Sequence, residues 1–199
     1  MMVSQCRSLR RLLRDWMADR RGIAATEFAF IVPLMLVLFF GTVEFCSAIA
    51  IDRKVTLMAR TLSDLTSQSI TVGDSDMTSF FGASNSIMYP YDMSPVRSTI
   101  TELYIDPTTH KAVVKWSKGS APHTPPGSTL TNVASGSSTV PIPTALLVDG
   151  TYLILSEVSY NYIPTVGYVM AKAGINLGDY AFTRPRQSTC VKYNPATAC

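Results

Sequence analysis

The stretch Arg20-Arg21-Gly22-Ile23-Ala24-Ala25-Thr26-Glu27-Phe28 decides the fold, because a basic leader ends here and an apolar segment, residues 29–40, follows directly. Glu27 stands at the start of that apolar segment. A carboxylate at the centre of a bilayer-spanning helix is disfavoured by roughly 2.5–3.5 kcal/mol, so we expect Glu27 to have a partner or a function. Cleavage after Gly22 would supply the partner. The new α-amine would lie at Ile23, and the ammonium of one subunit would neutralise the Glu27 carboxylate of its neighbour.

The apolar segment is long enough for one membrane-spanning helix. Residues 28–43 contain no charged side chain, and at about 1.5 Å per residue they cover about 24 Å. The hydrocarbon core of a bilayer is about 30 Å thick, so we predict a span over residues 23–51, which brings Glu27 or Glu44 into or near the membrane. Pro33 falls in the helix interior, where proline removes a backbone hydrogen bond. A kink needed for assembly and a tolerated membrane proline are both consistent with its position.

The basic charge of the chain is confined to its N-terminus. Residues 1–22 hold six arginines and two aspartates, a net charge of +4, whereas the rest of the chain carries −1 of the total of +3. This distribution removes the main support for nucleic-acid binding. Arginines before a span keep that end in the cytoplasm. We therefore predict a cytoplasmic leader (1–22), a membrane anchor (23–51) and a domain on the other side of the membrane (52–199).

The motifs around Gly22 resemble those of a known family. Gly22 followed by Glu27-Phe28 is similar to the processing site of type IV pilin-like proteins of the Flp/Tad subgroup. The string 22–34, continued by Gly41-Thr42-Val43-Glu44-Phe45, resembles the N-terminal signature of TadE-like minor pilins. Softer similarity to the same family occurs in residues 157–164 and 184–186.

The resemblance implies a bacterial protein whose span lies in the inner membrane and whose residues 52–199 lie in the periplasm. A prepilin peptidase is then expected to cut between Gly22 and Ile23. The resemblance also implies a part in building the tight-adherence (Flp) pilus, with other pilin-like subunits and pilus assembly proteins as partners and with adhesion and secretion as the processes served. The positions of the family motif that carry over to assembly are Glu27, Phe28, Pro33 and Glu44.

Beyond the span, the sequence predicts two helical regions. Apolar residues recur at three- and four-residue steps after residue 54, which predicts one long helix from Ile23 to about Ser69. A separate short amphipathic helix is the alternative. A second helix is expected to start at Gly73-Asp74-Ser75, with a polar N-cap. Its apolar face comprises Met77, Phe80, Phe81, Ile87 and Met88.

The remainder predicts an antiparallel sheet, so the fold class is α+β, with the pilin-like architecture that the resemblance implies. Residues 99–105 and 111–117 are rich in β-branched and aromatic residues and flank a turn, which predicts a hairpin. Residues 117–143 are rich in Ser, Thr and Pro and predict a surface loop. Residues 151–162 predict an interior strand, and 179–186 an edge strand, since proline is tolerated there. Residues 165–177 are left as a loop with a possible helix.

The sequence offers little for catalysis or ligand binding. Cys190 and Cys199 are predicted to form a disulfide in an oxidising compartment, with free or intermolecular thiols as the alternative. His110 and His123 lie in predicted turns or loops without metal-ligand spacing, so we expect surface histidines and no metal site. No phosphate loop or nucleophile motif occurs. We therefore expect neither an enzyme nor a cofactor nor a small-molecule substrate.

Two functional hypotheses follow. The first is a TadE-like pseudopilin that is processed after Gly22 and assembles by helix packing, inside the extracellular pilus or only in its assembly. The second is an uncleaved single-pass membrane protein whose periplasmic domain is a binding module for envelope or secretion components.

Overall fold

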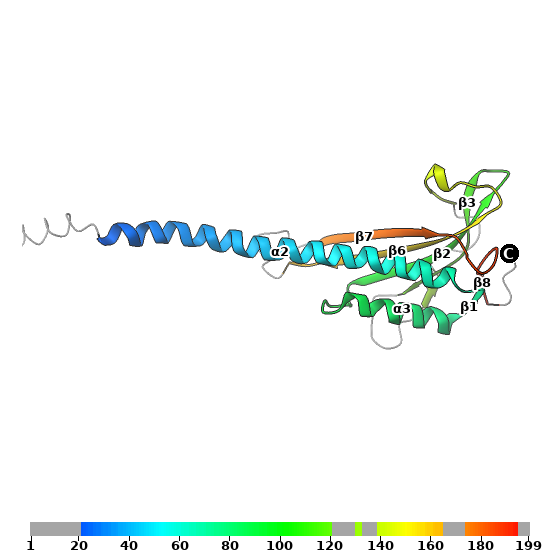
Figure 1. Ribbon diagram of the computed structural model, residues 1–199, viewed down its shortest axis with the longest axis horizontal. Coiled ribbons are helices and arrows are strands. Elements are labelled where there is room, and N and C mark those ends of the chain that lie inside the picture. Colours follow the sequence, from blue (N-terminus) through cyan, green and yellow to red (C-terminus); the bar gives the residue numbers. More distant parts are fainter. Residues whose placement is uncertain (1–20, 121–129, 133–138, 165–173, 195–199) are drawn as a thin grey trace, which may run out of the picture. The chain divides into compact units, whose positions relative to one another are not determined.

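The computed structural model describes residues 21–120, 130–132, 139–164 and 174–194 (Figure 1). The chain divides into two compact units, Met1–Phe45 and Cys46–Cys199. The helix α2 (Arg21–Ser67) begins in the first unit and ends in the second. The predicted leader, residues 1–22, lies almost entirely outside the described residues.

Helix α2 is a single helix of 47 residues with Pro33 inside it. The prediction of one long helix is confirmed, and the alternative of a separate short helix is wrong. The helix ends at Ser67, two residues earlier than expected. The Arg186 N–H donates to the Ser67 carbonyl oxygen (2.9 Å), which satisfies one of the carbonyls that a helix end leaves unpaired.

Helix α3 (Asp74–Met88) starts where the sequence predicts, but its N-cap is Gly73 rather than a polar residue. The Asp76 carboxylate compensates by accepting the Gly73 N–H (2.8 Å). At the other end, the Lys54 ammonium of α2 donates to the carbonyl oxygens of Ile87 (2.7 Å) and Tyr89 (2.9 Å). A cation at a helix C-terminus opposes the negative end of the helix dipole, so Lys54 joins the end of α3 to α2.

The main sheet has the order β4-β3-β2-β6-β7, with β5 also paired to β3 and every pair antiparallel. Its strands are β2 (Val96–Asp106), β3 (Lys111–Ser120), β4 (Leu130–Asn132), β5 (Thr139–Val140), β6 (Tyr152–Tyr162) and β7 (Ile175–Thr183). The predicted β2–β3 hairpin, the interior position of β6 and the edge position of the last long strand are confirmed. The α+β class is confirmed with them.

Two predictions about the loops need correction. The segment 117–143 is not simply a loop, because β3 continues to Ser120 and the short strands β4 and β5 extend the sheet beyond β3. A single 3-10 turn, η1 (Thr144–Leu146), follows. Strand β7 begins at Ile175, inside the region for which the sequence predicts a loop, and ends at Thr183. Residues 184–186 therefore lie after the strand, and 165–173 lie outside the described residues.

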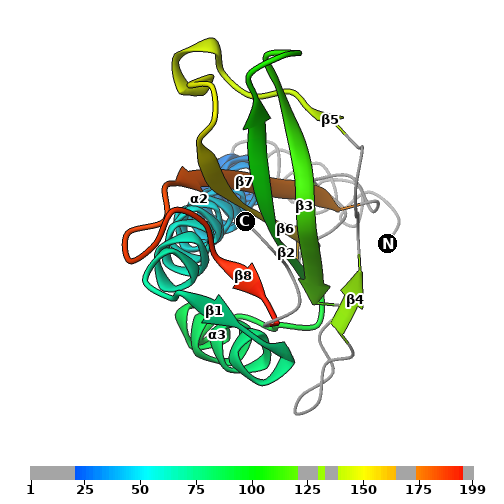
Figure 2. The ribbon, with the colours of Figure 1, turned by 90° about the vertical axis from the view of Figure 1, so that its right-hand side faces the viewer.

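Each face of the sheet carries its own core, because side chains alternate along a strand. On one face α2 and α3 lie side by side and cover Ile100, Ile154 and Val158 (Figure 2). On the other face Leu103, Leu153 and Leu155 pack with the β5–η1 segment. Leu62, Met77, Phe81 and Met88 complete the helical core, which confirms the predicted face of α3.

The C-terminal segment is tied to this core. Strand β8 (Lys192–Tyr193) pairs in parallel with β1 (Thr71–Val72), directly after α2. The backbone of Val191, which is fully buried, donates to the Glu102 Oε1 (2.6 Å) and accepts from the Trp116 Nε1 (2.8 Å). A polar pair from β2 and β3 thus holds a strand that arrives about 90 residues later in the chain.

Candidate membrane and assembly segment

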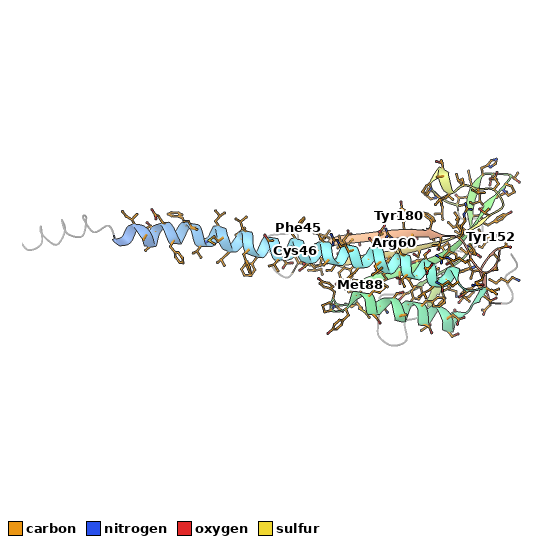
Figure 3. The ribbon with its side chains drawn as sticks, in the orientation of Figure 1. Phe45, Cys46, Arg60, Met88, Tyr152 and Tyr180 are labelled. Atoms are coloured by element: carbon orange, nitrogen blue, oxygen red, sulfur yellow. The ribbon has the colours of Figure 1, made fainter. Side chains whose placement is uncertain are left out.

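The part of α2 in the first unit presents apolar side chains on its surface. By length and composition α2 can cross a membrane from Gly22 onward, and none of its most apolar window is buried. Figure 3 shows these side chains standing out along the helix. The large apolar residues exposed here are Ile23, Phe28, Phe30, Ile31, Leu34, Met35, Leu36, Val37, Leu38, Phe39, Phe40, Val43 and Phe45.

The predicted processing site lies in the first turns of α2. Gly22 has no atom within 4 Å of the place where a Cβ would stand, and the same is true of Gly41. The fold of this chain therefore gives no steric reason for glycine at either position. Ile23 is 52% exposed, and its carbonyl oxygen accepts the Thr26 hydroxyl (2.8 Å). The structure thus leaves the Gly22–Ile23 bond at a surface, in helical conformation.

The two glutamates that bracket the span have different environments. Glu27 is exposed and has no hydrogen-bond or ion-pair partner among the described residues. Glu44 is only 7% exposed and has an interaction within the chain. They lie seventeen positions apart, which is about 26 Å along a helix axis. The sequence could not distinguish them, because both flank the same uncharged segment.

The other predicted assembly residues also lie on the helix surface. Phe28 is 68% exposed and follows Glu27 directly. Pro33 lies inside the helix, so its turn lacks one backbone donor. Further along, the Thr42 hydroxyl donates to the Leu38 carbonyl oxygen (2.8 Å). None of these residues contributes to the two cores of the second unit.

Residues 22–62 match the family model described as TadE-like protein. The resemblance to the TadE-like family is confirmed over this segment. The match begins at Gly22, covers the whole exposed apolar stretch and ends in the part of α2 that packs on the sheet. It associates the chain with the Tad pilus system. No curated protein and no solved structure matches the chain.

Among the cysteines, Cys190 is 2% exposed and disulfide-bonded, whereas Cys46 is free and exposed. The predicted partner Cys199 and the leader residue Cys6 lie outside the described residues. The disulfide lies next to Val191, so it reinforces the segment that Glu102 and Trp116 hold.

The predicted surface position of His110 is confirmed. His110 is exposed in the β2–β3 turn, with a positive φ of 52°, and its Nδ1 lies 2.8 Å from Asp149 Oδ1. His123 lies outside the described residues. No group of three or more His, Cys, Asp or Glu side chains in the described part of the chain is placed to hold a metal ion.

Sequence analysis did not single out Glu102, a carboxylic acid of the second unit whose pKa is raised. Glu102 is 2% exposed. Burial raises the pKa of its carboxyl from 4.5 to about 7, against the opposing effects of the Val191 N–H, Trp116 and Lys115. The alternation of side chains along the strand could have predicted that Glu102 is buried. Glu102 lies two residues after the core residue Ile100 and therefore faces the same side of the sheet.

Proposed function

We propose that this chain is a TadE-like pseudopilin that takes part in assembling a Flp/Tad-type pilus. Residues 23–51 anchor it in the inner membrane, and its helix packs against those of other pilin-like subunits. The match of residues 22–62 to the TadE-like family supports this most directly. The proposal includes no catalytic activity of the chain, so the energy of assembly comes from other proteins.

The orientation follows from charge. The leader carries a net +4 and the rest of the chain −1. By the positive-inside rule the leader stays in the cytoplasm and the second unit lies in the periplasm. An oxidising periplasm also accounts for the disulfide at Cys190.

Cleavage after Gly22 gives assembly a charge partner. Glu27 has no partner among the described residues of its own chain, and a carboxylate in a bilayer-spanning helix is costly without one. The amine freed at Ile23 of a neighbouring subunit can neutralise it. Because the amine exists only after processing, cleavage controls when subunits associate.

The test of processing is the intact mass of the protein extracted from membranes of its own host. We expect a chain that begins at Ile23. A chain that still begins at Met1 or Met2 in cells with an active prepilin peptidase contradicts the proposal. Gly22→Leu should block cleavage and piliation, whereas Gly41→Leu, the same change at a glycine with equal space, should leave cleavage intact. Full function of uncleaved Gly22→Leu would favour the single-pass binding module instead.

The test of charge pairing is Glu27→Leu. We expect this variant to insert and to be processed but not to assemble, because its helix is more apolar yet lacks the carboxylate. Membrane fractionation measures insertion, and shearing of surface pili measures assembly. Normal piliation in this variant would remove the charge-pairing argument.

A further inference from the structure

The outer edge of β7 is an open strand edge. Strand β7 ends the order β4-β3-β2-β6-β7 and pairs with β6 on one side. Within the described part of the chain no strand pairs with its other side. Such an edge presents an alternating row of unpaired N–H and C=O groups, which natural proteins commonly protect with lysine, proline or a very short strand. Strand β7 is nine residues long and contains neither lysine nor proline.

A groove runs beside this edge. It has a volume of about 580 Å³, within the range of about 300–1,000 Å³ typical of ligand clefts. One wall comes from α2 and the other from β7; Figure 3 labels Arg60 and Tyr180 on these two walls. Tyr180 is 59% exposed, and Leu57, one turn before Arg60 and Thr61 on α2, is 53% exposed. The groove therefore offers apolar surface next to unpaired backbone groups.

Of the two charged side chains that line the groove, Asp64 has an ion-pair partner among the described residues and Arg60 has none. The Asp64 carboxylate pairs with the Arg186 guanidinium (2.5 Å). Arg60 is exposed and has no ion-pair partner among the described residues. On β7 itself, the Tyr180 N–H donates to the Asp179 carboxylate of the same strand (2.8 Å). The Asp179 carboxylate thus accepts the Tyr180 N–H at the strand edge, and the carbonyl oxygen of a partner strand could accept this N–H instead.

We propose that the outer edge of β7 accepts an extended segment of a partner protein, which adds a strand to the sheet and places an acidic side chain beside Arg60. An extended backbone is the chemistry that matches an alternating row of donors and acceptors. The unpaired guanidinium supplies charge complementarity, and Leu65 and Tyr180 of the groove lining supply apolar contact. This inference concerns the second unit and does not require cleavage after Gly22.

The direction of the elements argues against a second copy of this chain as the occupant. Ser156, which pairs with Ala181 of β7, hydrogen-bonds the Ala59 carbonyl oxygen, and Ser63 hydrogen-bonds Thr183. Strand β7 therefore runs in the same direction as α2. Antiparallel pairing of two β7 edges would point the Cys46 ends of two α2 helices in opposite directions. On the proposed function, chains anchored in one bilayer have these ends pointing the same way.

The test uses the full chain in lipid nanodiscs and an eight-residue probe peptide of alternating threonine and valine with one central glutamate. We expect saturating peptide to slow amide hydrogen exchange in residues 175–183 at least tenfold. Tyr180→Pro removes the edge donor and should abolish this protection, whereas Tyr180→Phe keeps both the N–H and the ring and should retain it. Unchanged exchange in β2 and β6 verifies that the proline variant is folded.

A charge swap tests the same surface without altering the backbone. Replacing the glutamate of the peptide with lysine should weaken binding roughly two- to fivefold, the range for an exposed ion pair. Arg60→Glu should reverse this preference. Absence of protection at millimolar peptide, or protection that survives Tyr180→Pro, overturns the proposal. Protection that appears without peptide and grows with protein concentration would assign the edge to a second copy and overturn it as well.

Discussion

The buried carboxyl of Glu102 makes the stability of the second unit depend on pH. In the unfolded chain this group loses its proton near pH 4.5, whereas burial holds the proton in the folded chain up to about pH 7. Between these values the folded state binds more protons, so the free energy of unfolding falls as the pH rises. Each pKa unit corresponds to about 1.4 kcal/mol, which gives a loss of about 3 kcal/mol between pH 4.5 and pH 7.

Glu102→Gln isolates this effect. The glutamine carbonyl can still accept the Val191 N–H, but it carries no charge at any pH. We expect the variant to match the natural chain near pH 4.5 and to be more stable by about 3 kcal/mol at pH 8. Three aspartates, Asp74, Asp92 and Asp106, have lowered pKa values because hydrogen bonds from neighbouring side chains or backbone favour their charged forms. Their contribution is lost as the pH falls through those lowered values, below this window.

The assay is urea unfolding of the full chain in detergent micelles at pH 5 and pH 8, followed by near-ultraviolet circular dichroism. The signal reports on Trp116, whose ring lies 5.4 Å from that of Tyr193. Glu157→Gln, on the exposed side of β6, is the matched control and should leave the pH dependence unchanged. An equal pH dependence in Glu102→Gln and the natural chain would refute the reasoning, as would a less stable Glu102→Gln at pH 8.

Three further changes test how the second unit is held together. Gly174→Ala should cost clearly more stability than Gly150→Ala in thermal unfolding. Both glycines have a positive φ (76° and 70°), but only at Gly174 would an added Cβ clash, because it would lie 2.5 Å from a side-chain oxygen. Lys54→Met should cost about 1–2 kcal/mol and speed amide exchange at the end of α3, whose carbonyls lose a charged donor. Cys190→Ser should cost about 2–4 kcal/mol under oxidising conditions and nothing under reducing ones.

Elements with local signals could be predicted from the sequence. The apolar steps of α2, the face of α3 and the β2–β3 hairpin all depend on residues a few positions apart, and all three are confirmed. The predicted N-cap of α3 was wrong. Gly73 takes this position because the Asp76 carboxylate, inside the helix, accepts the Gly73 N–H. Strand β7 was placed too late: Ile175 and Leu177 alternate with polar Asn176, but the glycines on either side obscured the pattern.

Long-range contacts had no local signal. Strands β1 and β8 have two residues each and pair across about 120 positions, so neither could be predicted. In the candidate site the motif residues could be placed on a helix, but the different environments of Glu27 and Glu44 could not. Burial of Glu44 depends on tertiary structure, whereas the flanking uncharged segment looks the same from both ends.

On the proposed function, the exposed surface of α2 indicates which residues can make assembly specific. Lipid tails cover apolar side chains as well as a neighbouring helix does, so the phenylalanines and leucines of residues 28–43 favour the membrane without favouring any partner. A partner is distinguished from lipid only by groups that lipid cannot satisfy. Glu27 is such a group, because it is charged and has no partner among the described residues. Gly41 leaves open surface where another backbone can approach closely. On the proposed function, changes at Glu27 and Gly41 should therefore affect assembly, whereas exchanging one large apolar residue for another along the same helix should not.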